Sequence, residues 1–423
     1  MVEDLELYCI FVRDVMNFAK LMGMINNTGN NYNLMTNDRV IEKDELKTKH
    51  SQSERNPNFE ILRFLAMLFI VFWHFIVHGI MHCILPESKI IVNSTSFIGC
   101  ANYFISEYIV IITSVAVNCY ILISGYFLVK SSFKFTRITK VWAQTFFYAV
   151  AICLILYFTT SGMVGVKDII KSLTPIRSRS YWFVSIYCGM IILSPFLSKL
   201  ANSITKKGYE CLLLALFFLN AAFCYGPVYG GEFSLSWFVF LFFVAGYVRL
   251  YGFPLKRNYG KLSFLFSIIL FLSILIDSFW KVVFLKKTIA YSSIHYNGLC
   301  FFFSLFLFLW FKEHVFKRNL LNNLIVRFAP YTFGVYLIHD NDYIRSILWY
   351  KEFNPSNYIN SSLLIPIMFG ACIAIFGACI FLDFIRSKIF RYLKVDKFID
   401  IITSKMVLLV KYCLLSIEKL ILK

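Results

Sequence analysis

The stretch NFEILRFLAMLFIVFWHFIVHGIMH, residues 58–82, decides the fold of this 423-residue chain. From Leu62 to Ile80 it is almost wholly apolar, about the length that a helix needs to cross the hydrocarbon core of a bilayer. It nevertheless carries Arg63 near its start and His74 well inside. Ionisable side chains at such depth are costly and face a protein interior or a wet cavity, so both are candidate functional residues. Eleven residues separate them, which places them on one helix face roughly 16 Å apart, and Glu60 precedes Arg63 by one turn on much the same face.

The composition indicates a polytopic helical membrane protein. The chain is 59% apolar and only 16% charged, whereas about a quarter of the residues in a soluble domain are charged. Its apolar runs are continuous and recur too often for a secreted protein with one anchor, and they do not alternate as in a transmembrane β-barrel. The net charge of +18 does not indicate a nucleic-acid partner, because the basic residues fall between the apolar runs. The twelve Cys lie mostly inside these runs, which is typical of small core residues.

The sequence predicts an all-α transmembrane domain, residues 58–394, between a cytoplasmic N-terminal extension, residues 1–57, and an amphipathic C-terminal helix, residues 395–423. About ten spans are predicted: 61–80, 104–128, 141–160, 181–198, 211–226, 233–250, 262–280, 293–312, 328–349 and 361–383. The ninth is interrupted by Asp340, Asn341 and Asp342. Nineteen Lys and Arg flank the spans on one side and ten on the other. By the positive-inside rule, both termini lie in the cytoplasm.

Polar side chains recur at one depth. His339 and Asn118 each lie about as far from the basic residue at the inner end of their helix as His74 lies from Arg63. With a rise of 1.5 Å per residue, the three polar groups share a layer roughly 16–18 Å above the inner ends. Tyr336 precedes His339 by three residues on the same face. This spacing predicts a buried polar chamber.

A basic cluster follows the second predicted span, in the segment VKSSFKFTRITK. Lys134, Arg137 and Lys140, together with Lys130, place four cations at the predicted cytoplasmic entrance. Such a cluster suits a multiply phosphorylated ligand. The simpler interpretation is ordinary positive-inside charge.

Three other candidates have simpler structural explanations. Ser124 and Tyr126 flank Gly125, and small residues of this kind permit close helix packing. Trp182 lies at an outer span end, where aromatic residues form interfacial belts.

His78 and His82 continue from His74 at i+4 and i+8, a spacing that can bind a metal ion. We expect both at the outer interface, apart from the chamber, and predict no metal site.

Five stretches, in this order, resemble the integral-membrane acyltransferase 3 family, most closely its branch associated with capsular and exopolysaccharide O-acetylation. They are FEILRFLAMLFIVFWH, VNCYILISGYFL, FKFTRITKVW, YWFVSIYCGMIILSPFLSKL and TFGVYLIHD. The resemblance covers about residues 58–345. It implies an enzyme of the bacterial inner membrane that moves an acyl group, usually acetyl, from cytoplasmic acyl-CoA to a hydroxyl of a polysaccharide or lipid-linked sugar. Membrane lipids are its other partners, acetyl-CoA is a substrate, and no cofactor is permanently bound.

The resemblance also implies roles for individual residues. His74 and Arg63 fall in the catalytic helix of the family. Arg137 and Lys140 fall on its Arg-x-x-Arg motif, which is thought to meet the CoA phosphates. The second position is Lys, so bidentate phosphate contact is lost there while the charge remains.

A thioester is already activated, so the reaction needs a base for the acceptor hydroxyl and a donor for the oxyanion. His74 suits the first task, and Tyr336, His339 or Asn118 suits the second. Arg63 would hold a phosphate or orient the pantetheine arm. A covalent acyl-enzyme on Tyr, Ser or Cys is the alternative to direct attack.

The residues expected to line the chamber or to position the acceptor also include Glu60, Ser124, Tyr126 and Trp182.

Two other protein classes fit the same composition. A glycan or lipid flippase would also combine many spans with midplane polar groups, although no internal repeat is visible. A membrane sensor or scaffold could keep the fold without the chemistry.

Overall fold

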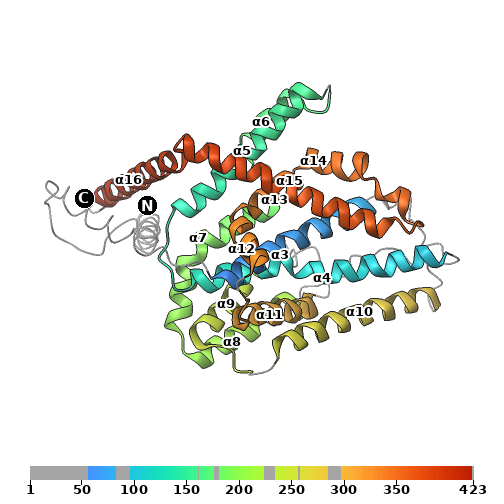
Figure 1. Ribbon diagram of the computed structural model, residues 1–423. Helices are drawn as coiled ribbons and strands as arrows, with labels where there is room; N and C mark the ends of the chain where they lie inside the picture. The colour runs from blue at the N-terminus through green and yellow to red at the C-terminus, as the bar shows by residue number, and fades with distance from the viewer. Residues whose placement is uncertain are drawn as a thin grey trace, which may run out of the picture.

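The computed structural model describes residues 56–81, 96–160, 162–175, 181–222, 234–255, 258–283, 297–317 and 319–421. All regular secondary structure in these ranges is helical (Figure 1). The predicted all-α class is therefore confirmed. The predicted N-terminal extension, except its last two residues, and His82 lie outside the described residues.

The helices are α3 (Pro57–His74), α4 (Phe97–Leu128), α5 (Thr136–Thr159), α6 (Val166–Ser172), α7 (Trp182–Ser203), α8 (Lys206–Phe217), α9 (Leu235–Tyr251), α10 (Tyr259–Val283), α11 (Asn297–Glu313), α12 (Leu320–Phe328), α13 (Thr332–His339), α14 (Asp342–Ser346), α15 (Leu364–Tyr392) and α16 (Val395–Ile421). Within the described residues, six helical segments are long and apolar enough to cross a membrane. They are Pro57–Ile80, Phe97–Leu128, Thr136–Thr159, Trp182–Ser203, Tyr259–Asp277 and Leu364–Tyr392. The other four predicted spans fall on shorter helices or on the broken segment that runs from α12 to α14.

The start of α3 follows from its first residues. The side-chain oxygen of Asn56 accepts the Asn58 N–H at 3.0 Å and caps the helix, and Pro57 occupies the first turn, where its missing N–H costs nothing. Directly after His74 the helix widens into a π-helical segment, Phe75–Met81. Such widened turns recur at functional sites.

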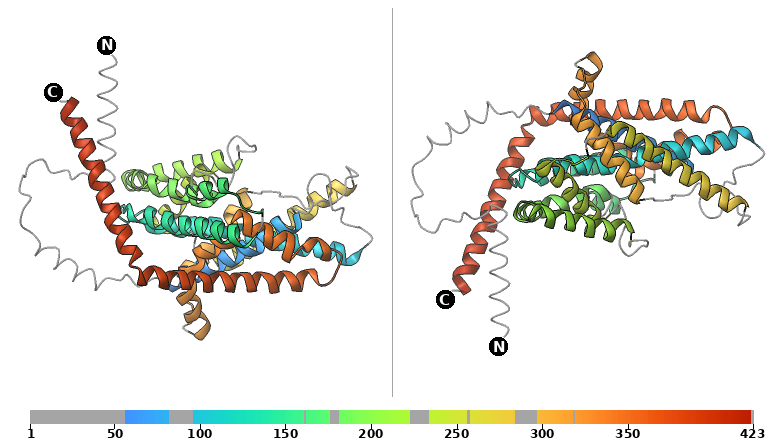
Figure 2. Two further views of the ribbon diagram at one scale, coloured as in Figure 1. Left: turned by 90° about the horizontal axis from the view of Figure 1, so that it is seen from above. Right: turned by 90° about the horizontal axis from the view of Figure 1, so that it is seen from below.

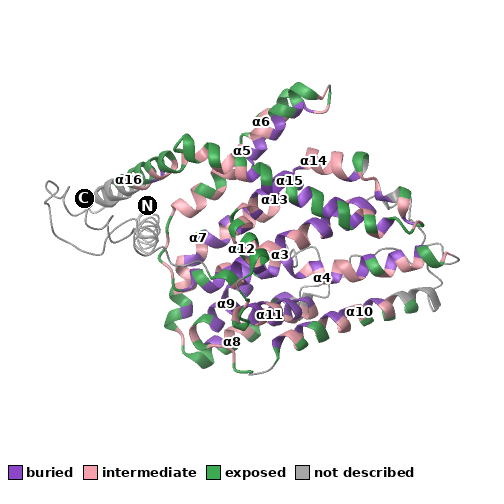
Figure 3. Ribbon diagram, in the orientation of Figure 1, coloured by how far each residue is buried: buried purple, intermediate pink, exposed green. Residues whose placement is uncertain are grey.

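Helix α3 belongs to both hydrophobic cores of the protein. Its first half, including Phe59 and Leu62, packs in a cluster built mainly from α4, α9 and α11. Its second half, including Val71 and Phe72, packs in a second cluster with α5, α13 and α15. Figure 3 shows the buried residues concentrated along the central helices, whereas α16 is largely exposed. The candidate residues of α3 therefore lie where the two cores meet.

The ninth predicted span is broken, as the Asp340–Asp342 stretch indicates. Helix α13 has only eight residues and is followed by Asp340 and the short helix α14. Polar side chains satisfy the freed backbone: Tyr181 donates its hydroxyl hydrogen to the Leu337 carbonyl at 2.9 Å, and the Asn341 amide donates to the Tyr181 oxygen at 2.9 Å. Irregular backbone inside a membrane protein is tolerated where protein groups satisfy it in this way.

A glycine lets α13 approach α15. A Cβ at Gly334 would overlap the carboxylate of Asp383. Asp383 is fully buried, pairs with Arg386 at 2.7 Å, and accepts hydrogen bonds from Tyr148 and Gln144. This network fixes the position of the short helix that carries Tyr336 and His339.

Helix α16 turns away from the bundle at its end (Figure 2). Lys394, with φ of 54°, makes the bend between α15 and α16. The helix then packs on α5, where Lys140 Nζ lies 3.3 Å from Asp400 Oδ1 and Thr403 donates to Thr139 at 3.0 Å. Most of its large apolar side chains with described positions are exposed. The amphipathic role predicted for residues 395–423 stays a prediction.

The close packing expected at Gly125 is present. A Cβ there would lie 2.9 Å from the Cα of Phe242 on α9, so the side of α4 that carries Gly125 packs directly against the backbone of α9. We predict that Gly125→Ala lowers the free energy of unfolding by about 1–3 kcal/mol, because one helix must shift. The thermal unfolding midpoint in detergent measures this.

Gly377→Ala on α15 is the matched control, because nothing lies within 4 Å of the added carbon. Alanine is the better helix former, so this midpoint should stay or rise slightly. Equal midpoints for the two variants would contradict the packing role of Gly125.

Candidate active site

A cavity of about 600 Å³ lies between α3, α4, α7 and the stretch that runs from the end of α12 into α13. Seven of the predicted site residues line it: Glu60, Arg63, His74, Asn118, Ser124, Trp182 and Tyr336. Five do not line it: Tyr126, Lys134, Arg137, Lys140 and His339. These seven residues come from four helices that are separate in the sequence, α3, α4, α7 and α13.

The cavity has an exposed end and a buried end. Its lining includes Asn56 and Phe127, which are exposed and lie near the start of α3 and the end of α4. His74, Asn118 and Tyr336, at the other end, are buried. At 1.5 Å per residue, the α3 wall from Asn56 to His74 is about 27 Å long. The shape suits an extended ligand whose reactive end reaches His74.

Arg63 lies part of the way along this wall. Its Nη1 is 2.5 Å from Glu60 Oε1, so the pairing expected from their spacing is present. The Arg63 side chain is 31% exposed and the Glu60 side chain 4%. Tyr120 donates its hydroxyl hydrogen to the Arg63 carbonyl at 2.9 Å and lies 3.3 Å from Thr332 Oγ1. These contacts tie α3 to α4 and to the start of α13.

His74 meets His339 directly. His74 Nδ1 lies 2.8 Å from His339 Nε2, and His339 Nδ1 lies 2.6 Å from the Val335 carbonyl oxygen one turn earlier in α13. His339 is fully buried and stands behind His74 rather than on the cavity wall. The shared depth predicted from spacing therefore becomes a contact between the two rings.

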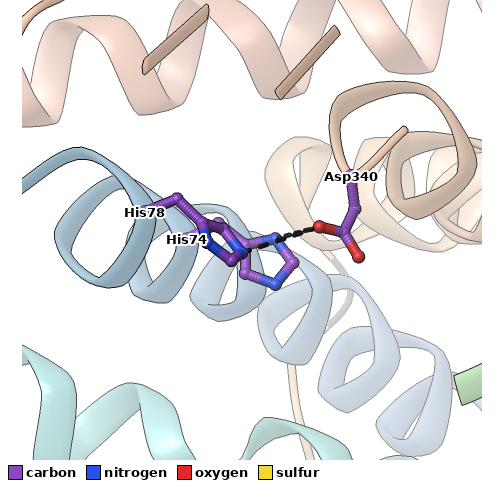
Figure 4. A group of neighbouring side chains, drawn as sticks. All are labelled: His74, His78 and Asp340. Atoms are coloured by element: carbon purple, nitrogen blue, oxygen red, sulfur yellow. Dashed lines mark ion pairs between the residues drawn. The ribbon is translucent and has the colours of Figure 1, made fainter. Parts of the chain in front are cut away.

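Two more polar groups join this pair. Figure 4 shows His74 and His78 on successive turns of the first membrane helix, both near Asp340. His74 Nδ1 and His78 Nε2 lie 3.7 and 3.8 Å from Asp340 Oδ1. The expectation that His78 lies apart from the chamber residues is wrong. Its i, i+4 spacing from His74 keeps the two ring centroids 4.8 Å apart, and the end of α13 brings Asp340 to both.

The ligand atoms of His74, His78 and Asp340 all lie within 4.8 Å of one another, a separation at which a metal ion can bind. Two contacts oppose this interpretation. Arg345 Nη1 lies 3.2 Å from the same Asp340 oxygen, and its charge would repel a cation. His74 Nδ1 is already hydrogen-bonded to His339. We therefore interpret the group as a polar cluster in which Arg345 pairs with Asp340 and His74 is hydrogen-bonded to His339.

Asn118 and Tyr336 line the same buried end but differ in their free hydrogen-bonding capacity. Asn118 Oδ1 accepts from Trp237 Nε1 at 2.8 Å, and its Nδ2 donates to Ser304 at 3.3 Å. The Tyr336 hydroxyl is buried and makes no hydrogen bond of standard geometry within the described part of the chain. It lies close enough to the Asp340 carboxylate and the Phe183 backbone to interact with both. A buried hydroxyl in this state is unusual.

The basic residues expected to bind phosphates lie outside the cavity lining. Arg137 is one helical turn before Val141, which does line the cavity, and it donates to Ser131 at 3.1 Å. Lys134 is exposed in the segment before α5. Lys140 is paired with Asp400 of α16.

Tyr126 is also turned away from the cavity. Its hydroxyl accepts a hydrogen bond from Arg249 at 2.9 Å, and the guanidinium carbon lies 4.7 Å from the ring centroid. The ring also contacts Phe59 and Phe308, so Tyr126 belongs to the core around α3, α4 and α11.

Sequence reasoning missed several residues of the site. Tyr120 and Thr332 hold α3 against its neighbours, but each lies in an apolar run without a charge to mark it. The sequence marks Asp340 only as an interruption of a predicted span, and it does not single out Arg345. The Asp-Asn-Asp sequence inside an apolar segment is the signal that could have found Asp340.

A family model described as "Acyltransferase domain" matches residues 56–383. This segment begins at the α3 cap, ends on Asp383 of α15, and contains every residue that lines the cavity. No curated protein and no solved structure matches the chain.

Proposed function

This chain belongs to the acyltransferase 3 family, and from that premise we propose that it transfers an acyl group, in our view acetyl, from cytoplasmic acyl-CoA to a hydroxyl of a cell-surface glycan or lipid-linked sugar. The observation that carries the proposal is the cavity along α3, open at an end near basic residues and buried at His74. Its length suits a long donor, and its buried end suits the transfer step. The family match gives no support to the flippase alternative.

The proposed reaction is a direct acyl transfer. The acceptor oxygen attacks the thioester carbonyl carbon while His74 takes the hydroxyl proton, and the tetrahedral intermediate then loses the thiolate. The proton passes from His74 to that sulfur, so the products are an ester and free CoA. No net proton is gained or lost. His74 is suited to both steps because imidazole accepts and donates protons near neutral pH.

Tyr336 is the donor we assign to the oxyanion. The amide of Asn118 is committed to Ser304, and both ring nitrogens of His339 are engaged. Tyr336, by contrast, has a hydroxyl with no hydrogen bond of standard geometry among the described residues. A donor held ready in a buried site stabilises developing charge without reorganisation.

The cationic groups near the open end are proposed to hold the CoA phosphates. Arg63 lines the wall, and Arg137 lies one turn from the lining residue Val141. Lys134, three residues before Arg137, is exposed. Lys140 is paired with Asp400, so it would have to interact with both the phosphate and this carboxylate. In this proposal acyl-CoA is a substrate, and no cofactor is permanently bound.

We further propose the finer topology. The chain would cross the bacterial inner membrane about ten times, with the short or broken helices α8, α9, α11 and α12–α14 completing the bundle. Both termini would lie in the cytoplasm, where the basic loops concentrate. The exposed apolar side chains of α16 would rest on the inner lipid surface.

The proposal predicts that His74→Ala reduces transfer to background while the protein accumulates normally. General-base catalysis contributes about 10²–10⁴-fold, so little activity should remain. The O-acetyl content of the glycan in the native host, read by NMR, measures this. His314→Ala, the same substitution at an exposed site, is the control. Unchanged acetylation in His74→Ala would refute the catalytic assignment, and an acylated protein trapped without acceptor would refute direct attack.

Tyr336→Phe tests the oxyanion donor. Removing one such donor typically costs about 10²–10³-fold in kcat, and the Kd for acyl-CoA should not change. Transfer of radiolabelled acetyl by purified protein in nanodiscs gives the rate, and calorimetry gives the affinity. Tyr157→Phe, at an exposed position on α5, should retain wild-type values. A loss of affinity without a change in kcat would show that Tyr336 binds acyl-CoA in the ground state and does not stabilise the transition state.

Arg137→Ala is expected to weaken acyl-CoA binding by about 10- to 100-fold, because a hydrogen bond to a charged phosphate is worth roughly 1.5–3 kcal/mol. Arg137→Lys should fall between, since the charge remains but the bidentate contact is lost. Direct binding measurements at two salt concentrations provide the check. Arg391→Ala, an exposed basic residue at the end of α15, is the control. If Arg137→Ala binds as tightly as the control, phosphate recognition lies elsewhere.

A further inference from the structure

The contact between His74 and His339 specifies where the protons on both rings must lie. His339 Nδ1 is 2.6 Å from the Val335 carbonyl oxygen, which can only accept a hydrogen bond. His339 must therefore carry a hydrogen on Nδ1. A neutral imidazole has one N–H, so His339 Nε2 is left as an acceptor.

The same reasoning extends to His74. Its Nδ1 lies 2.8 Å from His339 Nε2, a distance that requires one hydrogen between the two nitrogens. Because His339 Nε2 is the acceptor, His74 donates from Nδ1. The hydrogen bond to His339 and the 3.7 Å approach to Asp340 Oδ1 both involve Nδ1. In the neutral imidazole, His74 Nε2 therefore keeps its lone pair, on a residue that lines the cavity.

The neighbouring charges support this arrangement. Asp340 Oδ1, at 3.7 Å, is the nearest anion to His74 and faces the same Nδ1. Arg345 holds Asp340 through a contact of 3.2 Å, and His78 lies 3.8 Å from the same carboxylate. His339 is fully buried, so a second proton on it would place an added positive charge away from water and close to Arg345.

We infer that His339 is a positioning residue that holds His74 in the tautomer protonated on Nδ1, so that Nε2 is the nitrogen that accepts the proton of the acceptor hydroxyl. Asp340 then faces the imidazolium formed during transfer. The catalytic consequence rests on the proposed function, whereas the tautomer itself does not. The Val335 carbonyl orients the His339 ring, and His339 in turn orients the His74 ring. In other histidine bases a carboxylate holds the imidazole in this way.

The tautomer can be read directly. The protein is labelled with ¹⁵N-histidine, placed in lipid nanodiscs at about pH 8, where an ordinary imidazole is neutral, and examined by solid-state ¹⁵N NMR. The signals of His74 are identified by their loss in His74→Gln. We expect a protonated Nδ1 and an unprotonated Nε2. In His339→Leu the His74 signals should shift to the Nε2-protonated form or to a mixture.

Two outcomes would overturn the inference: His74 protonated on Nε2 in the wild type, or an unchanged tautomer in His339→Leu. Neither depends on activity. A protein that shows the expected tautomer but transfers no acyl group would refute the proposed function alone.

Kinetics then test the consequence. His339→Leu should lower kcat by at least about tenfold, within the range of a general base, with the Kd for acyl-CoA unchanged. His339→Gln should restore much of the rate, because its amide oxygen can accept from His74 Nδ1. His314→Leu and His314→Gln carry the same changes at an exposed site. Equal losses in His339→Leu and His339→Gln would show that the ring matters only for packing.

Discussion

Ionisable groups inside a membrane helix must be satisfied by other protein groups, and this requirement shapes the whole site. Lipid offers no hydrogen-bond partners, so each polar side chain on α3 has to meet a partner within the protein, as Arg63 meets Glu60. His74 does so through His339 and Asp340 at the end of α13. That partnership requires a helix that stops at the right depth, which is what the eight-residue α13 provides.

The break after α13 in turn demands its own compensation. Tyr181 and Asn341 satisfy the freed backbone, and Gly334 allows the short helix to lie against the buried Asp383 of α15. Helix α3 contributes to both hydrophobic cores, so the first residues of the cavity wall are held by one and the residues near His74 by the other. The site thus depends on apolar packing for its frame and on a small polar network for its orientation.

Much of this could be predicted from the sequence. Apolar run lengths predict the helical membrane class. The distance of each polar residue from the basic end of its helix predicts a common depth for His74, His339 and Asn118, and His74 and His339 are in contact. Spacing along one helix cannot show which helices are neighbours. It therefore missed that His339 stands behind His74, that the polar atoms of Asn118 are committed to Trp237 and Ser304, and that His78 reaches Asp340. Loop charges likewise could not show that Lys140 meets an acidic residue of α16.

The short length of α13 has a mechanical consequence. Tyr336 and His339 are three residues apart on a single eight-residue helix, fixed at one point by the Gly334–Asp383 contact. One displacement of this short helix relative to α3 would therefore shift both Tyr336, which lines the cavity, and the His339 ring behind His74. Substitutions in α15, which does not line the cavity, can therefore disturb both residues at once.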